Sequence, residues 1–221
     1  MSKKMMRILE LFAGTESLAK VARAKGHEVI TLDISAKHNP TICVNILEWN
    51  YTVFPPDHFD YIHASVPCEN YSVCRSTGSE RDLEQADSLV KKTIEILSYF
   101  KTLWTLENPA SSLLWKRPVA QALEQIAKTS YCRYGYPYRK HTWFANNIRL
   151  KLQPQCDGTC GQMVGRLHTT HAQKGGGGVT KQYHSLDQLH SIPPTLCSEI
   201  LAQVEAVQLV LADLWEIKSK T

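Results

Sequence analysis

A cysteine follows an apolar, strand-like run in the first third of the chain. Residues 59–66 have the composition of a strand and lead directly into Pro67 and Cys68. A thiol at the point where a strand gives way to a loop is held on a rigid element yet faces a cleft, as a nucleophile requires. One cysteine beside a proline is also typical of a buried core residue, so the other elements must decide between a nucleophile and a core thiol.

A glutamate has the same kind of position after a second strand. Residues 102–106 form a short apolar run that leads into Glu107, Asn108 and Pro109. Because Asn-Pro favours turns, the simplest interpretation of this tripeptide alone is a turn after a buried strand. Beside Cys68, it also places a carboxyl group at the end of a strand, where it could take part in the same chemistry.

The first strand and its turn have the features of a ligand site. Residues 7–12 form the strand, the turn after it contains Gly14, and a second strand ends in Asp33, 19 residues further on. A small residue in such a turn lets the backbone approach a ligand, and an acid about 20 residues on can bind ribose hydroxyls. The single glycine favours a nucleoside without a pyrophosphate, and S-adenosylmethionine is the obvious one. Many βαβ units end in an acid without binding a ligand, so this pattern alone leaves cofactor binding open.

A parallel sheet would bring these groups together. Strand-like runs alternate with helical spacing in the first half of the chain, which predicts an α/β fold built on βαβ units. The runs are residues 7–12, 28–33, 41–46, 59–66 and 102–106. The polar stretch 69–87 is interpreted as a loop that closes over substrate. Residues 194–215 predict a final helix that packs near the first βαβ unit, and its expected apolar face comprises Leu196, Ile200, Val204, Val207, Leu211 and Leu214.

Length and composition indicate one soluble domain with a small insert. The chain has 221 residues, 43% of them hydrophobic, and no apolar run approaches the ~18 to 20 residues that span a bilayer. Its seven cysteines are scattered and odd in number, which favours free thiols in a reducing compartment. We therefore expect an intracellular, soluble protein of the cytoplasm or nucleus, with no membrane partner.

The positive charge is concentrated in one quarter of the chain. Residues 131–183 hold eight basic residues against one acidic residue, a net charge of +7, whereas the remainder carries −3. Tyrosines, a tryptophan and a phenylalanine are interleaved with these basic residues. Basic and aromatic residues together suit phosphate contact and base stacking, although a solvated loop region has the same composition.

Three ordered motifs resemble those of the cytosine-C5 methyltransferases. Residues 11–14 (Leu-Phe-Ala-Gly) are similar to the S-adenosylmethionine-binding motif of that family, Pro67-Cys68 to its nucleophile motif, and residues 107–109 (Glu-Asn-Pro) to its glutamate motif. Residues 138–144 look like its arginine-bearing strand, and residues 192–194 like its last motif, which closes the cofactor pocket. The resemblance covers roughly residues 7–146 and 186–212. It implies a doubly wound, mostly parallel sheet of the S-adenosylmethionine-methyltransferase (Rossmann-like) type with a small irregular insert.

The resemblance implies a role for individual residues. Cys68 would attack C6 of a cytosine, Glu107 would stabilise the charge that develops at N3, and Arg139 would hold the base carbonyl and orient Glu107. The base must be flipped out of a duplex or already be single-stranded. The expected cofactor-binding residues are Phe12, Ala13, Gly14, Thr15, Glu16, Ser17, Leu18, Asp33, Ile34, Asn45, Ile46 and Pro67. The expected substrate-binding residues are Ser72, Arg75, Asn108, Lys140 and His141, and Asn108 would also order the cysteine loop.

The chain departs from the family pattern at three positions. Glu69 stands where a glutamine usually follows the Pro-Cys pair, and a carboxylate there should raise the pKa of Cys68. His141 replaces a second arginine, and His190 replaces an asparagine near the last motif. These changes put the rate and the residue-by-residue transfer in doubt rather than the reaction type.

The insert is short. The catalytic core would comprise residues 1–146, completed by residues 187–221, and this leaves only residues 147–186 for target recognition. Few base contacts fit in such a segment, so we expect short or relaxed sequence specificity, or a partner protein that supplies it. The insert contains four candidate zinc ligands that could stabilise a segment with little core of its own: Cys156, Cys160, His168 and His171. Their spacing is not that of a standard finger, and free thiols with solvated histidines are the alternative.

The sequence thus predicts an S-adenosylmethionine-dependent DNA (cytosine-5)-methyltransferase. An RNA cytosine remains an alternative substrate, because no residue here identifies a 2′-hydroxyl contact. A second alternative is a non-catalytic protein of the same fold that binds nucleic acid or the cofactor. The presence of both Cys68 and Glu107 argues against it. A third alternative is an enzyme that transfers a modified group from a derivative of S-adenosylmethionine. No residue in the sequence indicates such a reaction.

Overall fold

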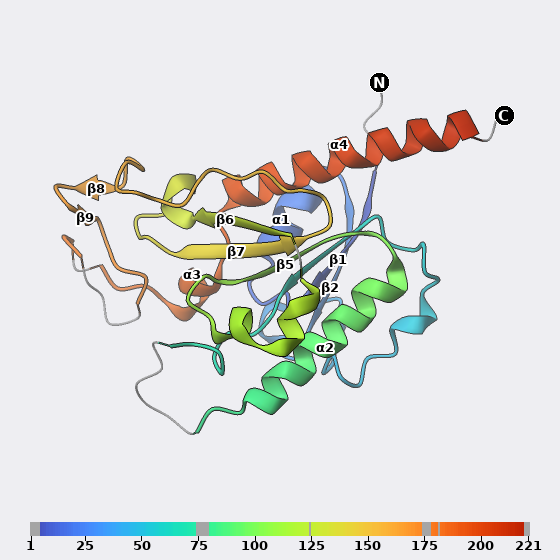
Figure 1. The fold of residues 1–221 in the computed structure, drawn as a ribbon, viewed down its shortest axis with the longest axis horizontal. Coiled ribbons are helices and arrows are strands. Elements are labelled where there is room, and N and C mark those ends of the chain that lie inside the picture. The colour runs from blue at the N-terminus through green and yellow to red at the C-terminus, as the bar shows by residue number, and fades with distance from the viewer. Residues whose placement is uncertain (1–4, 74–79, 124, 174–177, 181, 219–221) are drawn as a thin grey trace.

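The computed structural model describes residues 5–73, 80–123, 125–173, 178–180 and 182–218. Seven strands form one sheet in the order β3-β2-β1-β4-β5-β7-β6, and a two-stranded ribbon lies apart from it at one end of the molecule (Figure 1). The strands of the sheet are β1 (Arg7–Leu11), β2 (Glu28–Asp33), β3 (Ile42–Cys43), β4 (Tyr61–Ser65), β5 (Leu103–Pro109), β6 (Ile126–Ser130) and β7 (His141–Asn146). The ribbon comprises β8 (Met163–Val164) and β9 (Leu167–His168). The helices are α1 (Ser17–Ala24), α2 (Leu83–Phe100), α3 (Leu186–His190) and α4 (Pro194–Lys218). Short 3-10 helices are η1 (Ala36–His38), η2 (Tyr51–Val53), η3 (Leu113–Lys116), η4 (Pro118–Ala122) and η5 (Tyr131–Tyr134).

The sheet is mostly parallel and buried on both faces. Strand β1 pairs in parallel with β2 and β4, and β4 pairs in parallel with β5, whereas β7 runs antiparallel to β5 and β6. Successive side chains of β1 enter different cores: Ile8 packs with Tyr61 and the helices α1 and α4, and Leu9 packs with Ile62 and helix α2. Figure 1 shows α2 and α4 on opposite sides of the sheet. This is the predicted doubly wound architecture, in which apolar residues on both sides of a strand are expected.

Helix α4 packs beside α1, as predicted, but its apolar face is shorter than expected. Leu196, Ile200 and Val204 are fully buried against α1 and the sheet. Leu211, predicted to lie on the same buried face, is 47% exposed, because the helix continues past the edge of the domain (Figure 1). The side chain of Leu214 lies outside the described residues. Among the helices of the described chain, none is both long and apolar enough to cross a membrane.

Two boundaries differ from the sequence prediction. The polar stretch 69–87 is not a loop throughout, because α2 begins at Leu83, where the Asp82 side chain accepts a hydrogen bond from Gln85 N at 2.8 Å. A side-chain acceptor at this position satisfies a free N–H of the first turn and starts the helix. Strand β3 covers only Ile42–Cys43 rather than residues 41–46.

Candidate active site

A cavity of about 440 Å³ lies at the carboxyl ends of the central strands. The strand order reverses between β1 and β4, and open α/β sheets bind ligands at such a reversal. The volume is in the range of about 300–1,000 Å³ that is usual for small-molecule sites. Residues of the β1, β2, β4 and β5 ends line it, together with parts of α2 and the chain before α4: Glu10, Phe12, Ala13, Gly14, Thr15, Ser17, Leu32, Asp33, Ile34, Ser35, Val44, Asn45, Ile46, Ser65, Val66, Pro67, Cys68, Glu69, Gln85, Leu89, Glu107, Pro109, Lys140, His190 and Ile192.

The turn between β1 and α1 has an unusual backbone. Phe12, Gly14 and Glu16 have φ values of 55°, 45° and 55°. These values lie in the left-handed region, which residues other than glycine rarely adopt. Gly14 N donates to Asp33 Oδ2 at 2.8 Å, and Ser35 N donates to Asp33 Oδ1 at 2.8 Å. Asp33 therefore joins the first turn to the end of β2. A bulky residue held in this conformation beside a cavity is a sign of a functional constraint.

Glu10 is a cavity residue that sequence reasoning missed. It is buried in β1 and accepts hydrogen bonds from Leu18 N at 3.2 Å and Ala19 N at 2.8 Å, at the start of α1. Burial is the main cause that raises its pKa to about 7, and the two backbone donors oppose it. The available signal was a carboxylate inside an otherwise apolar strand, since acids are rarely buried without a partner.

Cys68 is half-buried at the cavity wall just beyond β4. Burial is the main cause that raises its pKa to about 11, and the Glu69 carboxylate is the next. The effect expected of Glu69 is thus present. Cys68 O accepts from Tyr71 N at 3.1 Å, and the buried Tyr71 donates its hydroxyl to Asp87 Oδ1 at 2.8 Å. The turn that carries the thiol is therefore fixed to α2.

Glu107 lies in β5 opposite Ser65, so it faces the same cavity as Cys68. Its side chain accepts from Tyr131 Oη at 3.2 Å. Burial raises the pKa of the Glu107 carboxyl, while the Lys140 charge and the Tyr131 hydrogen bond lower it. A carboxyl group with a raised pKa can hold a proton at higher pH than usual and donate it to a bound base.

The Asn108 side chain forms a hydrogen bond with the segment that leads to Cys68. Its Nδ2 donates to Val66 O at 2.8 Å, two residues before Cys68. Asn108 is fully buried, so this contact is shielded from solvent. A hydrogen bond of this kind is what the loop-ordering role requires.

Lys140, rather than Arg139, reaches the cavity. Lys140 lines it, donates to Leu189 O at 2.9 Å and places Nζ 4.8 Å from the centre of the Tyr131 ring. Arg139, expected beside Glu107, is exposed and is not part of the lining. Adjacent residues of an extended segment point to opposite sides, so only one of the two can face Glu107. His141 points elsewhere too, with Nδ1 2.6 Å from Ser130 Oγ.

Most of the expected cofactor residues line the cavity, but two lie elsewhere. Glu16 forms an ion pair with Arg23 at 2.8 Å, and Leu18 is fully buried against α4. Of the expected substrate residues, Ser72 O accepts from Arg81 Nη2 at 2.8 Å, and Arg75 lies outside the described residues.

The segment before α4 closes the cavity from the far end of the chain. His190 and Ile192 line it, and Ile192 N donates to Ser17 Oγ at 3.0 Å. An exposed ion pair of 2.7 Å between Lys37 and Asp187 adds a second tie. This is the placement that the last motif implies.

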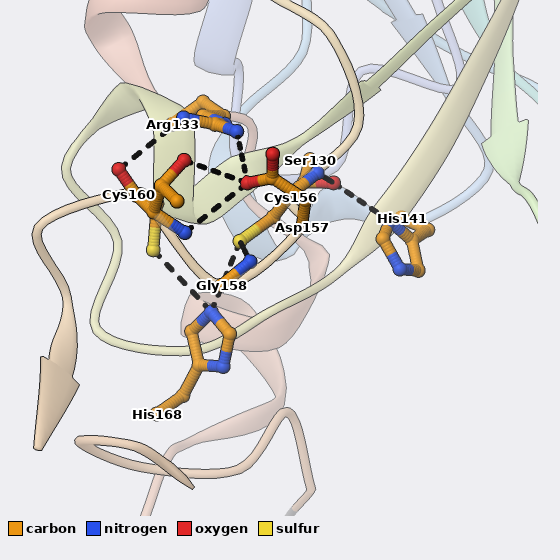
Figure 2. Close-up of polar contacts among 9 residues, drawn as sticks. Ser130, Arg133, His141, Cys156, Asp157, Gly158, Cys160 and His168 are labelled. Carbon is orange, nitrogen blue, oxygen red and sulfur yellow. Dashed lines mark hydrogen bonds and ion pairs between the residues drawn. The ribbon is translucent and has the colours of Figure 1, made fainter. Parts of the chain in front are cut away.

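The candidate zinc ligands of the insert come together only in part. Figure 2 shows Cys156 and Cys160 beside His168, whose Nε2 lies 3.5 and 3.4 Å from the two sulfur atoms. Among the described residues, the fourth member of this group is Cys132 in η5. His171, the fourth ligand expected from the sequence, is exposed and lies outside this group. Cys132 was missed because it precedes the insert and has no spacing signature with the other three.

The chain is similar to proteins that are described as methyltransferases. It is 29% identical over 223 residues to a "Probable DNA (cytosine-5)-methyltransferase" of Frog virus 3 (isolate Goorha), with 89% of this chain and 99% of that protein covered. No family model matches the chain. The solved structure of the Entamoeba histolytica methyltransferase EhMeth superposes with a TM-score of 0.51 at 16% identity, covering 69% of this chain and 57% of that one. A Spodoptera frugiperda DNMT2 structure gives a TM-score of 0.42 at 14% identity, with 69% and 53% covered. The sheet order and the EhMeth superposition together give the chain the methyltransferase (Rossmann-like) fold.

Proposed function

We propose that this protein is an S-adenosylmethionine-dependent methyltransferase that acts on C5 of a cytosine in DNA. One observation carries the proposal: Cys68 and Glu107, from the ends of two neighbouring strands, line the same cavity as the turn that contains Gly14. A fold alone does not determine a reaction, but a thiol and a buried carboxyl group beside a nucleoside-sized site are the groups that this reaction needs. The similarity to the Frog virus 3 protein supports the same reaction.

The cavity residues fit the proposed cofactor. The tight turn at Gly14 allows close approach of a ligand, and Asp33, although it binds Gly14 N and Ser35 N, keeps lone pairs for ribose hydroxyls. Asn45 and Ile46 line the same end of the cavity. The bound cofactor supplies an electrophilic methyl group.

Cys68 and Glu107 would activate the base. The Cys68 thiolate adds to C6 and forms a C–S bond, and the electron pair of the C5–C6 double bond moves toward N3, where the Glu107 carboxyl donates a proton. C5 then has the electron density needed to take the methyl group. Water then takes the C5 proton, the C–S bond breaks to return the Cys68 thiolate, and the Glu107 carboxylate takes back the N3 proton, which restores the aromatic ring. Because the pKa of Cys68 is raised, its thiol proton must pass to solvent as the base binds.

Lys140 would occupy the place beside Glu107 that was expected of Arg139, and Arg139 would have a different role. Lys140 favours the charged forms of both Cys68 and Glu107, since its charge lowers the pKa of each. Arg139, on the exposed side of the same segment, would contact the nucleic acid. We further propose that residues 1–146 and 187–221 form the catalytic core, and that the basic insert 147–186 recognises the target with short or relaxed specificity, alone or with a partner protein.

A mechanism-based trap tests the proposal. The protein is mixed with S-adenosylmethionine and a DNA oligonucleotide containing 5-fluorocytosine, which cannot lose the C5 substituent, and its intact mass is measured. Wild-type protein should gain the mass of the oligonucleotide plus a methyl group, and Cys68→Ala should gain none. Absence of an adduct with the wild type, or an adduct with Cys68→Ala, contradicts the mechanism. An adduct only with the matching RNA oligonucleotide would identify RNA as the substrate.

A further inference from the structure

Four ligand atoms converge between the insert and the main sheet. Cys132 belongs to η5. Cys156 and Cys160 belong to the loop of the insert, and His168 belongs to β9 (Figure 2). Their three sulfur atoms and one ring nitrogen all lie within 4.8 Å of one another. Cys132, Cys156 and His168 are 1%, 6% and 9% exposed, so three of the four members are buried, whereas Cys160 is partly exposed.

Two distances within this group match the edge of a tetrahedral metal site. Zinc binds thiolate sulfur at about 2.3 Å and imidazole nitrogen at about 2.0–2.1 Å, so the S···N edge of a tetrahedron is about 3.6 Å. The observed distances from His168 Nε2 are 3.5 Å to Cys156 Sγ and 3.4 Å to Cys160 Sγ. Both distances fit such an edge, although an ordinary hydrogen bond to sulfur has the same length, so the convergence of all four ligand atoms within 4.8 Å carries the argument for a shared ion.

A second layer of hydrogen bonds holds the ligands in place. Gly158 N donates to Cys156 Sγ at 3.3 Å, and Cys156 N donates to Ser130 Oγ at 2.9 Å. Arg133 Nη2 forms an ion pair of 2.7 Å with Asp157, between the two cysteines of the insert (Figure 2). Such supporting contacts fix the orientation of metal ligands and help to stabilise the bound ion.

Little else holds together the part of the insert between the ligands. In residues 157–169, all of which the structure describes, only the ligand His168 is buried, the regular structure is β8 and β9, and Val164 and Leu167 are 51% and 56% exposed. A segment of this size without a core needs a disulfide or a metal to be ordered. The cysteines are free thiols, which leaves their sulfur atoms available to an ion.

We propose that Cys132, Cys156, Cys160 and His168 bind one structural zinc ion. Three thiolates and an imidazole complete a four-coordinate site, and a site without an open position serves structure rather than catalysis. The ion joins the insert to η5 and so fastens a segment that follows β7 to one that precedes it.

The site also has a consequence for the proposed reaction. Cys132 directly follows Tyr131, the residue that donates to Glu107. Zinc would thus fix the position of the insert relative to Tyr131, the hydrogen-bond partner of Glu107. This consequence rests on the proposed function, whereas the zinc site itself does not.

Metal analysis tests the site independently of activity. The full chain is purified without chelators and its zinc content is measured, together with that of Cys132→Ser and of His171→Ala. Wild type and His171→Ala should hold about one zinc per chain. Cys132→Ser should bind zinc more than about a hundredfold more weakly, because even changes to residues that only support a ligand cost about 10–100-fold. Retention of zinc by Cys132→Ser with loss in His171→Ala would overturn the assignment.

X-ray absorption at the zinc edge keeps the test decisive if Cys132→Ser does not fold. The wild type should show three sulfur neighbours at about 2.3 Å and one nitrogen at about 2.0–2.1 Å. The proposal fails if the wild type holds well under one zinc and its reduced apoprotein takes up no zinc, or if the ion has a different ligand set. A zinc-containing protein that forms no 5-fluorocytosine adduct would contradict the proposed function and leave the zinc site intact.

Discussion

The catalytic cavity and the insert organise their chemical groups in different ways. Cys68 lies just after the buried strand β4, and Glu107 lies in the buried strand β5. Packing on both faces of the sheet therefore determines their positions. The four proposed zinc ligands come from η5, from a loop of the insert and from one pair of two-residue strands, so their order would depend on the ion and on the hydrogen bonds around it. A site supported by a core should tolerate loss of a ligand, whereas a site that replaces a core should not.

Removal of zinc should therefore have the largest effect, and only on one region. Apparent binding energies of structural zinc are about 10–16 kcal/mol, far more than a segment of this size can gain from packing. Treatment with a strong chelator should raise amide hydrogen exchange throughout residues 156–168 and leave β1 and β4 protected. Peptide-resolved exchange by mass spectrometry measures both regions in one sample. Equal loss of protection in β4 would show that the insert and the sheet do not differ in this way.

Glu107→Gln should have the next largest effect, on rate and not on folding. Glutamine can hydrogen-bond N3 but cannot give it a proton, so methyl transfer should fall about 10²–10⁴-fold in a single-turnover assay. Tyr131→Phe removes the hydroxyl that donates to Glu107 and that also contacts Thr142, and it should cost much less because the proton donor is kept. A smaller loss for Glu107→Gln than for Tyr131→Phe would place the essential group on the tyrosine.

The same contrast explains what the sequence could predict. Local periodicity in the sequence was enough to predict three features. These are the βαβ unit, the motifs at the strand ends and the packing of α4 near α1. Strand β6 was missed because its short sequence of mixed polarity is a strand only through pairing with β7, which is distant information. The choice between Lys140 and Arg139 depends on which of two neighbours faces the sheet, and a one-residue shift in register reverses it.

The zinc ligands illustrate the limit most clearly. Cys156, Cys160 and His168 share the insert and could be grouped by spacing. Cys132 is 24 residues before Cys156, and only the β6–β7 hairpin brings it to the others. His171 was the nearer candidate along the chain, but it lies outside the group of four. Glu10 is a different case, since the sequence does show a carboxylate within an apolar strand, and this signal could have predicted a buried functional residue.

Glu10 predicts how stability changes with pH. Its pKa is raised from 4.5 to about 7 in the folded protein, so the folded state holds a proton that the unfolded state has lost. The contribution is fully present below about pH 4.5 and is lost as the pH rises through about 7, a change of about 3 kcal/mol. Burial lowers the pKa of His63 to about 3, and this group makes stability rise with pH below about 6.5, so the Glu10 contribution is read from the difference between wild type and Glu10→Gln. The difference in unfolding free energy between the two proteins, measured by urea unfolding from pH 5 to 8, should show this decline. Glu28→Gln, at an exposed position of β2, is the matched control and should leave the slope unchanged.

Glu69→Gln should have the smallest effect and bears on the catalytic cavity alone. Burial is the main cause of the raised pKa of Cys68, and Glu69 adds to it, so removing this exposed charge should lower the pKa only in part. At pH 8 alkylation proceeds through the thiolate, and the rate at Cys68 should rise about twofold to fivefold, the size expected of one exposed neighbouring charge. Peptide mass spectrometry after iodoacetamide treatment gives this rate, with the exposed Cys43 as an internal reference. An unchanged rate at Cys68 would mean that burial alone sets its reactivity, and that the glutamate at this position has no electrostatic cost for the nucleophile.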